Sequence, residues 1–463
     1  VGSLIGVGEA NVIMDVSSIH DFVPGQVLVT EMTDPDWEPI LKKAAAVVTN
    51  SGGRTCHAAI ISRELGIPCL VGCETATQAI KSGEVVTVDC SSGETGTVWE
   101  GQLPYKVNEV ALDNIPETRT SIMMNLANPA MAFKKSFIPN KGVGLARMEF
   151  IVNNHIKAHP LALLDPDSAM VRAEDRAAIK ELIANHKDGR DYFVDTLSQG
   201  VATLAAAFYP NKVILRFSDF KTNEYANLLG GANFEPKEDN PMIGWRGASR
   251  YYSDSYRAGF AMECEAVKRV RERMGLDNLV VMVPFCRTPE EGRKVVAEMA
   301  RNGLHQSDGV SIYCMCEIPS NVILANEFLD VFDGFSIGSN DLTQLVLGVD
   351  RDSATVAHIY DERNAAVKEM IKRVIDVARA RGKYVGICGQ GPSDYPDFAE
   401  FLVECGIESM SLTPDTVLST TLAVKAVEDR MSAAAADSVS SESEDDGAFV
   451  PLAVLARRAA MMQ

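Results

Sequence analysis

The first part of the chain alternates short apolar runs with turn residues. Residues 1–103 are rich in Val, Gly and Thr, and runs such as GQVLVTEM, AAVVTNS, IPCLVGC and EVVTVDC are separated by turn signals. Runs of this length predict strands, and an amphipathic stretch at residues 57–65 predicts a helix. We therefore predict a small, strand-rich α/β domain over residues 1–103.

A second pattern covers residues 121–430, where short apolar runs alternate with longer amphipathic stretches. It predicts eight strands alternating with helices, which is typical of a (β/α)8 TIM barrel. Between the two regions, residues 104–120 carry two prolines and mixed polarity, so we predict a linker there. The eight apolar runs are SIMMNLA, GVGLAR, VILRF, NLVVMVPF, GVSIYCMC, GFSIG, YVGIC and SMSLT.

The last stretch, residues 431–463, begins as a low-complexity segment of Ala, Ser and acidic residues, SAAAADSVSSESEDD. Such a composition offers too little apolar surface to offset the entropy of folding, so we predict disorder. The pattern of the last dozen residues is compatible with a short amphipathic helix.

Composition and charge narrow the classes of function. A chain of 463 residues with 46% hydrophobic and 23% charged residues is long enough for two or three globular domains. Its 44 Lys and Arg against 63 Asp and Glu give a net charge of −19, which argues against nucleic-acid and anionic-membrane binding. No apolar run approaches the roughly 20 residues of a membrane span, and no secretory leader pattern opens the chain. The ten cysteines form no CxxC pair, so we expect free thiols and a cytoplasmic location.

The stretch SGGRTCHAAIISRELGIP places one histidine in a setting suited to an anion. NSGGRT predicts a glycine loop, and HAAIISREL predicts a helix that ends at Gly66. His57 then lies in the first helical turn, where unpaired backbone N–H groups and the helix dipole favour negative charge. Gly53 lets the backbone approach the anion, and Thr55 offers a hydroxyl. We expect a phosphorylated imidazole, with a capping or packed histidine as the alternative.

Arginines lie at or near the carboxyl ends of predicted barrel strands, where TIM-barrel active sites gather. Arg147 ends the second run and Arg216 lies late in the third. We expect these two, followed by Arg246 and Arg351, to bind phosphate through their guanidinium forks. Taken singly, an arginine is more often a surface ion-pair residue, and the convergence of these arginines on strand ends favours the phosphate site.

Two carboxylates follow neighbouring predicted strands, Glu317 after the fifth and Asp341 after the sixth. Hard oxygen donors of this kind suit Mg²⁺ beside a phosphorylated ligand, where a metal would stabilise an enolate oxygen. A network of carboxylates and arginines is the alternative, and the two interpretations are compatible. Cys314 and Cys316 alternate along a buried strand, so we expect them to pack rather than to bind a metal.

Seven segments follow one another along the chain: GGRTCHAAIISRELGIP, GVGLARMEF, RFSDFKTNEY, NPMIGWRGASR, MCEIPSN, GFSIGSNDLTQLVLGVDRD and GICGQGPSD. Taken together, these segments resemble the enzymes that interconvert phosphoenolpyruvate (PEP) and pyruvate through a phosphohistidine, and among them the phosphoenolpyruvate synthase (pyruvate, water dikinase) branch. The resemblance implies a swivelling β/β/α phosphohistidine domain followed by a TIM barrel that binds PEP, pyruvate and Mg²⁺. Barrels of this type often pair, so a homodimer is a further expectation.

The resemblance also implies a role for each site residue. His57 would carry the phosphoryl group, supported by Gly53 and Thr55, and Cys388 in GICGQG would move the proton at the methyl carbon. We expect the neighbouring glycines to leave Cys388 open to the barrel mouth; an inert buried thiol is the alternative. Glu317 and Asp341 would hold the metal. The implied substrate-binding residues are Arg147, Arg216, Arg246, Glu317, Gly338, Ser339, Asn340, Asp341 and Arg351.

The reaction implied by the resemblance converts ATP, pyruvate and water into AMP, PEP and phosphate. The family's ATP-grasp domain would precede Val1, so we expect this chain alone to perform only the PEP half-reaction. One alternative is the PEP–protein phosphotransferase of sugar uptake, which would need a helical insertion for which residues 1–103 have no room. Another is pyruvate, phosphate dikinase. A non-catalytic phosphocarrier or regulatory remnant is an alternative of a different class.

Overall fold

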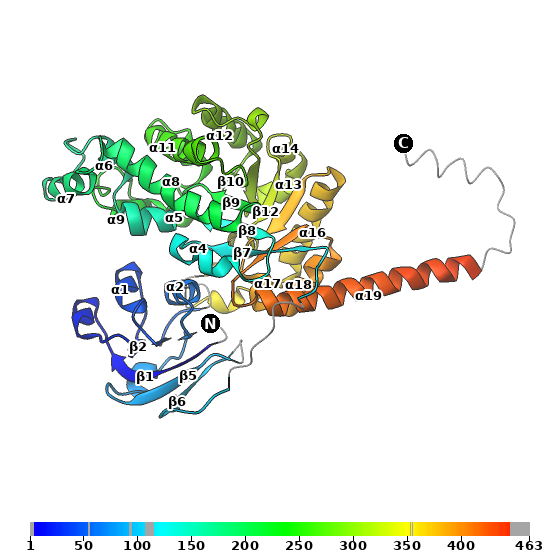
Figure 1. The fold of residues 1–463 in the computed structure, drawn as a ribbon, viewed down its shortest axis with the longest axis horizontal. Coiled ribbons are helices and arrows are strands. Elements are labelled where there is room, and N and C mark those ends of the chain that lie inside the picture. Colours follow the sequence, from blue (N-terminus) through cyan, green and yellow to red (C-terminus); the bar gives the residue numbers. More distant parts are fainter. Residues whose placement is uncertain are drawn as a thin grey trace.

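The computed structural model describes residues 4–53, 56–91, 95–106, 115–351, 353 and 355–444, without the side chains of Asp21 and of residues 435–444. It shows a six-stranded sheet followed by a closed eight-stranded barrel, which confirms the predicted fold class (Figure 1). Within these ranges, no helix combines the length and the apolar character that a bilayer crossing requires.

The amino-terminal sheet has the strand order β4-β3-β2-β1-β5-β6. Strands β1 to β4 are parallel, and β5 and β6 extend the sheet in antiparallel fashion. Two apolar clusters cover its opposite faces, so β2 and β3 are buried at every position. The strands are β1 Ile5–Val12, β2 Val27–Thr30, β3 Ala46–Thr49, β4 Cys69–Leu70, β5 Val85–Asp89 and β6 Thr97–Glu100.

Among the described residues, three short α-helices complete the amino-terminal domain, α1 Glu38–Leu41, α2 His57–Leu65 and α3 Ala76–Ala79, together with 3-10 helices at Val16–Asp21 and Pro35–Trp37. Helix α2 begins at the predicted histidine and ends where Gly66 adopts φ 71°, a left-handed conformation that glycine takes without strain. Both ends of the predicted helix are thereby confirmed. Helices α1 and α2 lie on the side of the domain that faces the barrel (Figure 1).

The barrel closes in the order β10-β11-β12-β13-β14-β7-β8-β9 with every pairing parallel. Each of the eight predicted runs forms one of its strands. A cluster that includes Met123, Leu145, Met282 and Met315 fills the interior. The strands are β7 Ser121–Leu126, β8 Gly142–Arg147, β9 Lys212–Arg216, β10 Leu279–Val283, β11 Ile312–Cys316, β12 Gly334–Ile337, β13 Tyr384–Ile387 and β14 Ser409–Leu412.

Helices cover the outside of the barrel and form one continuous apolar core with its strands. Two of them, α5 and α11, continue as π-helical turns over Val152–Ile156 and Arg269–Arg273. The helices are α4 Pro129–Ser136, α5 Met148–Ile151, α6 Pro160–Leu164, α7 Ala173–Ile183, α8 Gly189–Phe208, α9 Thr222–Asn227, α10 Ala248–Tyr251, α11 Arg257–Lys268, α12 Pro289–Arg301, α13 Pro319–Ile323, α14 Ala325–Leu329, α15 Ser339–Leu347, α16 Ala365–Ala380, α17 Gly391–Asp394, α18 Pro396–Glu404 and α19 Val417–Glu444.

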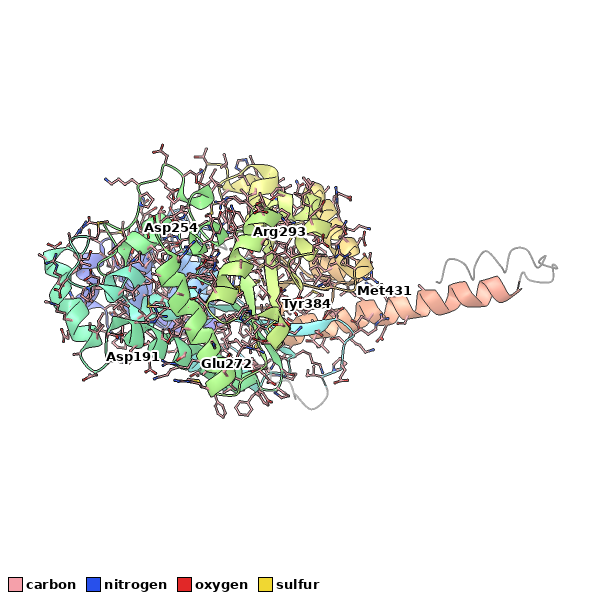
Figure 2. All side chains as sticks on the ribbon, turned by 90° about the horizontal axis from the view of Figure 1, so that it is seen from above. Asp191, Asp254, Glu272, Arg293, Tyr384 and Met431 are labelled. Atoms are coloured by element: carbon pink, nitrogen blue, oxygen red, sulfur yellow. The ribbon has the colours of Figure 1, made fainter. Side chains whose placement is uncertain are left out.

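Helix α19 packs on α18 at its start and then projects away from the barrel, past the labelled Met431 (Figure 2). The structure therefore differs from the predicted disorder over residues 431–444. The alanine-rich run SAAAAD has a high helix propensity, and it extends a helix that packing has already nucleated. Residues 445–463 lie outside the described residues.

The chain passes once between the two domains, from the end of β6 at Glu100 to the start of β7 at Ser121. No second strand or helix of the described residues crosses between them. The other contacts between the domains are therefore non-covalent.

Candidate active site

A cleft of about 340 Å³ lies between the two domains. Residues of the amino-terminal domain line one side of it, and residues at the carboxyl ends of barrel strands line the other. The cleft thus joins groups from distant parts of the sequence. The predicted site residues that line it are His57, Arg147, Arg216, Arg246, Glu317, Gly338, Asn340, Asp341, Arg351 and Cys388.

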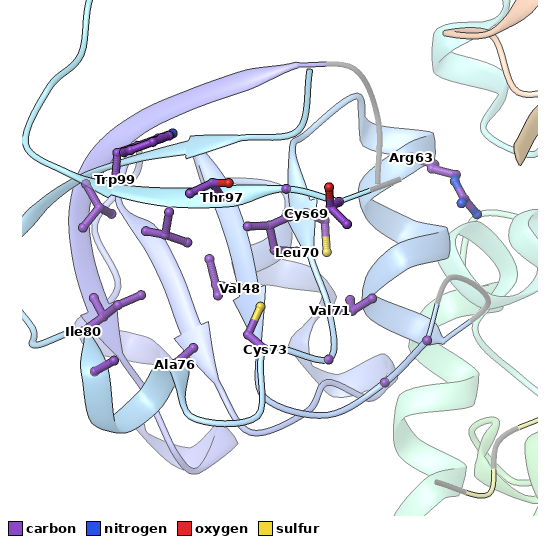
Figure 3. A pocket seen from close by; sticks show the side chains of 18 of the residues that line it. Val48, Arg63, Cys69, Leu70, Val71, Cys73, Ala76, Ile80, Thr97 and Trp99 are labelled. Carbon is purple, nitrogen blue, oxygen red and sulfur yellow. The ribbon is translucent and has the colours of Figure 1, made fainter. Parts of the chain in front are cut away.

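Three predicted residues are not among those that line the cleft. Ser339 is buried, and its Oγ donates a hydrogen bond to Glu362. Gly53 lines a different, larger cavity of about 1220 Å³, and Thr55 lies outside the described residues. Figure 3 shows the larger cavity, with apolar side chains such as Leu70 and Trp99 around it. None of the predicted barrel residues belongs to its described lining, so we place the site in the smaller cleft.

His57 is half-buried at the first position of α2. Its Nδ1 lies 3.1 Å from the hydroxyl of Thr33, so Nε2 is the ring nitrogen opposite this contact. Burial lowers the pKa of His57, and the nearby carboxylates of Glu38 and Asp34 oppose that shift only in part. The imidazole is therefore neutral near pH 7, the form that acts as a nucleophile.

Three carboxylates meet on the barrel side of the cleft. Asp219, Glu317 and Asp341 each place an oxygen within 4.8 Å of the others. Glu317 Oε1 accepts a hydrogen bond of 2.7 Å from the backbone N–H of Phe285, whereas the buried Oε2 has no hydrogen-bond partner among the described residues. Burial and repulsion from the other two carboxylates raise the pKa of Glu317 well above its usual value. A cation would relieve both costs, so the trio fits a divalent metal.

Arginines surround the same carboxylates. Arg246 pairs with both oxygens of Asp219, and one of its nitrogens lies 3.2 Å from Asp341. Arg216 pairs with Asp219 and Arg351 with Asp341, each at 3.2 Å. Burial alone would raise the pKa of Asp341, but the arginines lower it to about 2. The network expected as the alternative to a metal site is therefore present, and it is built from the same side chains.

Cys388 lines the cleft, but the residue is buried, with only 3% of it exposed to solvent. The predicted opening is wrong. Gly389 lies so close to α15 that a Cβ at position 389 would stand 1.7 Å from Ser339 Oγ, so the glycine serves close packing instead of exposure. Burial raises the pKa of the Cys388 thiol to about 11, which keeps it protonated at neutral pH.

Two residues that the sequence analysis missed belong to this network. Asp219 follows the end of β9, and Glu149 follows the end of β8. Glu149 Oε1 lies 3.2 Å from Arg216 and accepts a hydrogen bond from the backbone N–H of Asp219. Active-site residues of TIM barrels follow the carboxyl ends of strands, which is how Arg147 and Arg216 were predicted. The same criterion would have found Glu149, two residues after Arg147, and Asp219, three residues after Arg216.

A buried polar cluster supports the segment between Arg216 and Asp219. Ser218 donates from its hydroxyl and its N–H to Glu263, and its carbonyl accepts 2.7 Å from the hydroxyl of Tyr251. The N–H, the hydroxyl and the carbonyl of Ser218 are therefore all hydrogen-bonded, which fixes the backbone between Arg216 and Asp219. Burial raises the pKa of Glu263 to about 7.

Two family models match the chain. The model of the PEP-utilising enzyme mobile domain matches residues 22–93, and that of the PEP-utilising enzyme PEP-binding domain matches residues 105–429. A phosphoenolpyruvate synthase of Synechocystis sp. (strain ATCC 27184 / PCC 6803 / Kazusa) is 61% identical over 92% of this chain and 52% of its own length. The phosphoenolpyruvate synthase of Escherichia coli (strain K12) is 55% identical over 92% of this chain and 53% of its own length.

The chain therefore spans about half the length of the curated relatives it matches. Among solved structures, an HpcH/HpaI aldolase/citrate lyase family protein from Burkholderia cenocepacia J2315 is similar, with a TM-score of 0.34 and 12% identity over 69% of this chain and 95% of its own. The sequence resemblance to PEP-utilising enzymes is confirmed by the two domain models and by the relatives. With the PEP-binding domain model alone matching residues 105–429 of 463, the chain belongs to the PEP-utilising enzyme family.

Proposed function

We propose that this chain catalyses the PEP/pyruvate half-reaction of a phosphotransferase, with His57 as the phosphoryl carrier. The observation that carries the proposal is the shared cleft, which His57 lines from one domain and the arginines and carboxylates of the barrel line from the other. The names of the relatives, phosphoenolpyruvate synthase, supply the substrates.

In the proposed reaction, the arginines hold the phosphate of PEP and neutralise its charge. Nε2 of His57 attacks phosphorus, so an N–P bond forms while the bond between phosphorus and the enol oxygen breaks. The electron pair stays on that oxygen and gives the enolate of pyruvate. Arg147 and Arg216 are suited to this task because guanidinium groups bind phosphate oxygens in pairs and retain their charge when partly buried. Positioning and charge neutralisation are the main requirements of such a transfer.

Glu317 and Asp341 would hold Mg²⁺ in this proposal, with Asp219 as the third neighbouring carboxylate. The buried, unpaired Oε2 of Glu317 supports this choice. When bound, the metal supplies positive charge beside the phosphate and the enolate oxygen. The carboxylates themselves keep the surrounding arginines oriented toward the cleft.

Cys388 would deliver the proton that converts the enolate into pyruvate. The thiol hydrogen passes to the methylene carbon, and the electron pair of the S–H bond remains as thiolate. Its raised pKa, about 11, supports the role of a proton donor because the thiol is protonated before the step. In reverse, the thiolate takes a proton from the methyl group.

The complete reaction would convert ATP, pyruvate and water into AMP, PEP and phosphate. We infer that ATP would be used by a part of the protein outside this chain, since the relatives are about twice as long. The chain alone would then release one pyruvate for each phosphorylated His57.

Labelling with [32P]PEP and Mg²⁺ tests the proposal. We expect acid-labile label on the protein and a matching amount of pyruvate, measured with lactate dehydrogenase and NADH. His57→Ala should abolish both signals, whereas His20→Ala, an exposed histidine of the same domain, should retain them. Label that persists in His57→Ala would refute the carrier assignment, and a parent protein that forms neither label nor pyruvate would refute catalysis of the half-reaction.

A further inference from the structure

Helix α2 carries two charged side chains that contact the barrel about two turns beyond His57. Arg63 lies 3.2 Å from Asp394, and Glu64 Oε1 lies 3.6 Å from Arg147 Nη1. Figure 3 shows Arg63 on α2, apart from the apolar side chains of the larger cavity. Both ion pairs join the two domains, but only that of Glu64 uses a residue that we assign to substrate phosphate.

The Glu64 carboxylate stands in the cleft itself. Its lining includes Glu64, Arg147 and His57 together, and the side chains of Glu64 and Arg147 are 21% and 27% exposed. A carboxylate and a phosphate present similar oxygens to a guanidinium fork. One oxygen of Glu64, 3.6 Å from Nη1, therefore occupies the guanidinium that the phosphate of PEP would bind.

We propose that Glu64 is a positioning residue for Arg147, which holds the guanidinium in the cleft until the phosphate of PEP displaces the carboxylate. This inference rests on the proposed function. It makes PEP binding compete with one of the two ion pairs that join α2 to the barrel within the described residues. The Arg63–Asp394 pair does not take part in the exchange, so it still connects the domains while Arg147 turns to the phosphate.

Proton exchange accompanies the displacement. Burial raises the pKa of Glu64 to about 7, Arg147 lowers it in part and Glu38 adds to the rise. His57 and Glu149 line the same cleft. When a phosphate takes Arg147, Glu64 loses its cation and gains a negative neighbour, so its pKa rises further and it binds a proton. PEP binding should therefore take up a proton above about pH 7 and weaken as the pH increases from there.

Calorimetric titration with PEP and Mg²⁺ tests the proposal in full-length His57→Ala protein, which binds PEP without transfer. Adding Glu64→Gln should lower the Kd for PEP about twofold to fivefold, the range expected for one partly exposed ion pair. Titrations in buffers with different ionisation enthalpies should show proton uptake in the parent and less of it in the Glu64→Gln protein. In protein that retains His57, the substitution should lower KM for PEP with little change in kcat.

Two control variants separate this effect from others. Glu38→Gln removes the same charge from the same cleft, but Glu38 pairs with Lys42 at 2.9 Å, so we expect less than a twofold change in Kd. Asp394→Asn breaks the other interdomain ion pair and should not tighten PEP binding. If Glu38→Gln and Glu64→Gln lowered the Kd for PEP equally, the cause would be the loss of one negative charge anywhere in the cleft, and the proposal would be overturned. Unchanged or weaker binding in Glu64→Gln would also overturn it, whereas no PEP binding by the parent would overturn the proposed function as well.

Discussion

Arg246 donates two hydrogen bonds to Asp219, one of 3.0 Å from Nε to Oδ1 and one of 2.7 Å from Nη2 to Oδ2. The same carboxylate lies 3.2 Å from Arg216. One aspartate therefore fixes the orientation of two arginines that we assign to phosphate. Paired hydrogen bonds of this kind set the plane of the guanidinium as well as its position.

Asp219→Asn should impair phosphoryl transfer more than it impairs folding. The amide turns one acceptor into a donor that faces a guanidinium, so both arginines lose their fixed geometry. Misplacement of this order costs about 10²-fold in rate, and we expect such a loss in kcat/KM for PEP in rapid-quench labelling of His57. Asp167→Asn, which alters an exposed ion pair with Lys180, is the matched control. If Asp219→Asn were labelled at the normal rate, Asp219 would not be needed to position the arginines for phosphoryl transfer.

Cys388→Ala should separate the two chemical steps. In the proposed mechanism, phosphoryl transfer from PEP to His57 does not need the thiol, whereas exchange of the methyl protons of pyruvate does. We expect exchange to fall by about 10²-fold or more, the usual contribution of a general acid–base group, when followed by proton NMR in deuterated water. Cys405→Ala, at the end of α18, should leave exchange intact. Undiminished deuteration in Cys388→Ala would make Cys388 an inert thiol.

Glu317→Gln should remove most of the increase in Tm that Mg²⁺ and PEP cause. In His57→Ala protein, Mg²⁺ together with PEP should raise Tm by several degrees because both bind the folded state. Removal of the carboxylate charge should reduce that increase to less than about 1 °C, and EDTA should reverse it in the parent. The control is Glu327→Gln, an exposed glutamate on α14. An equal Mg²⁺ response in Glu317→Gln would locate the metal elsewhere.

The barrel should lose stability as the pH increases. The folded-state pKa of Glu263, about 7, lies above the usual value of 4.5, so its contribution is complete below about pH 4.5 and disappears as the pH passes through 7. That contribution is at most about 3 kcal/mol. Urea unfolding from pH 5 to pH 8 should show a smaller decrease in Glu263→Gln than in the parent protein. Glu265→Gln, an exposed neighbour on α11, should retain the full decrease.

Most of the barrel could be predicted because its strands are buried along nearly their whole length. Runs such as LVVMV in β10 are apolar at every position, and turn or helix signals separate one run from the next. The strands that escaped prediction have weaker patterns. Glycine and alanine interrupt the apolar positions of β1, and β6 is mostly exposed at the edge of the sheet.

The sequence could predict those site residues whose positions follow from the strand topology alone. Parallel strands bring their carboxyl ends to one mouth of a barrel, which is why Arg216, Glu317 and Asp341 could be grouped from the sequence. Contacts between domains follow no such rule, so nothing in the sequence relates Glu64 to Arg147. The burial of Cys388 depends on how closely Gly389 approaches α15, a packing detail that composition does not encode.

The single passage of the chain between Glu100 and Ser121 would set the kinetic order of the proposed phosphoryl transfer. Because His57 and the barrel belong to one polypeptide, their encounter in the proposed reaction would be unimolecular, at an effective concentration on the order of millimolar. Dilution of the protein therefore leaves the rate constant for transfer unchanged. If the two domains were supplied as separate polypeptides, the same step would become second order and would slow in proportion to their concentration.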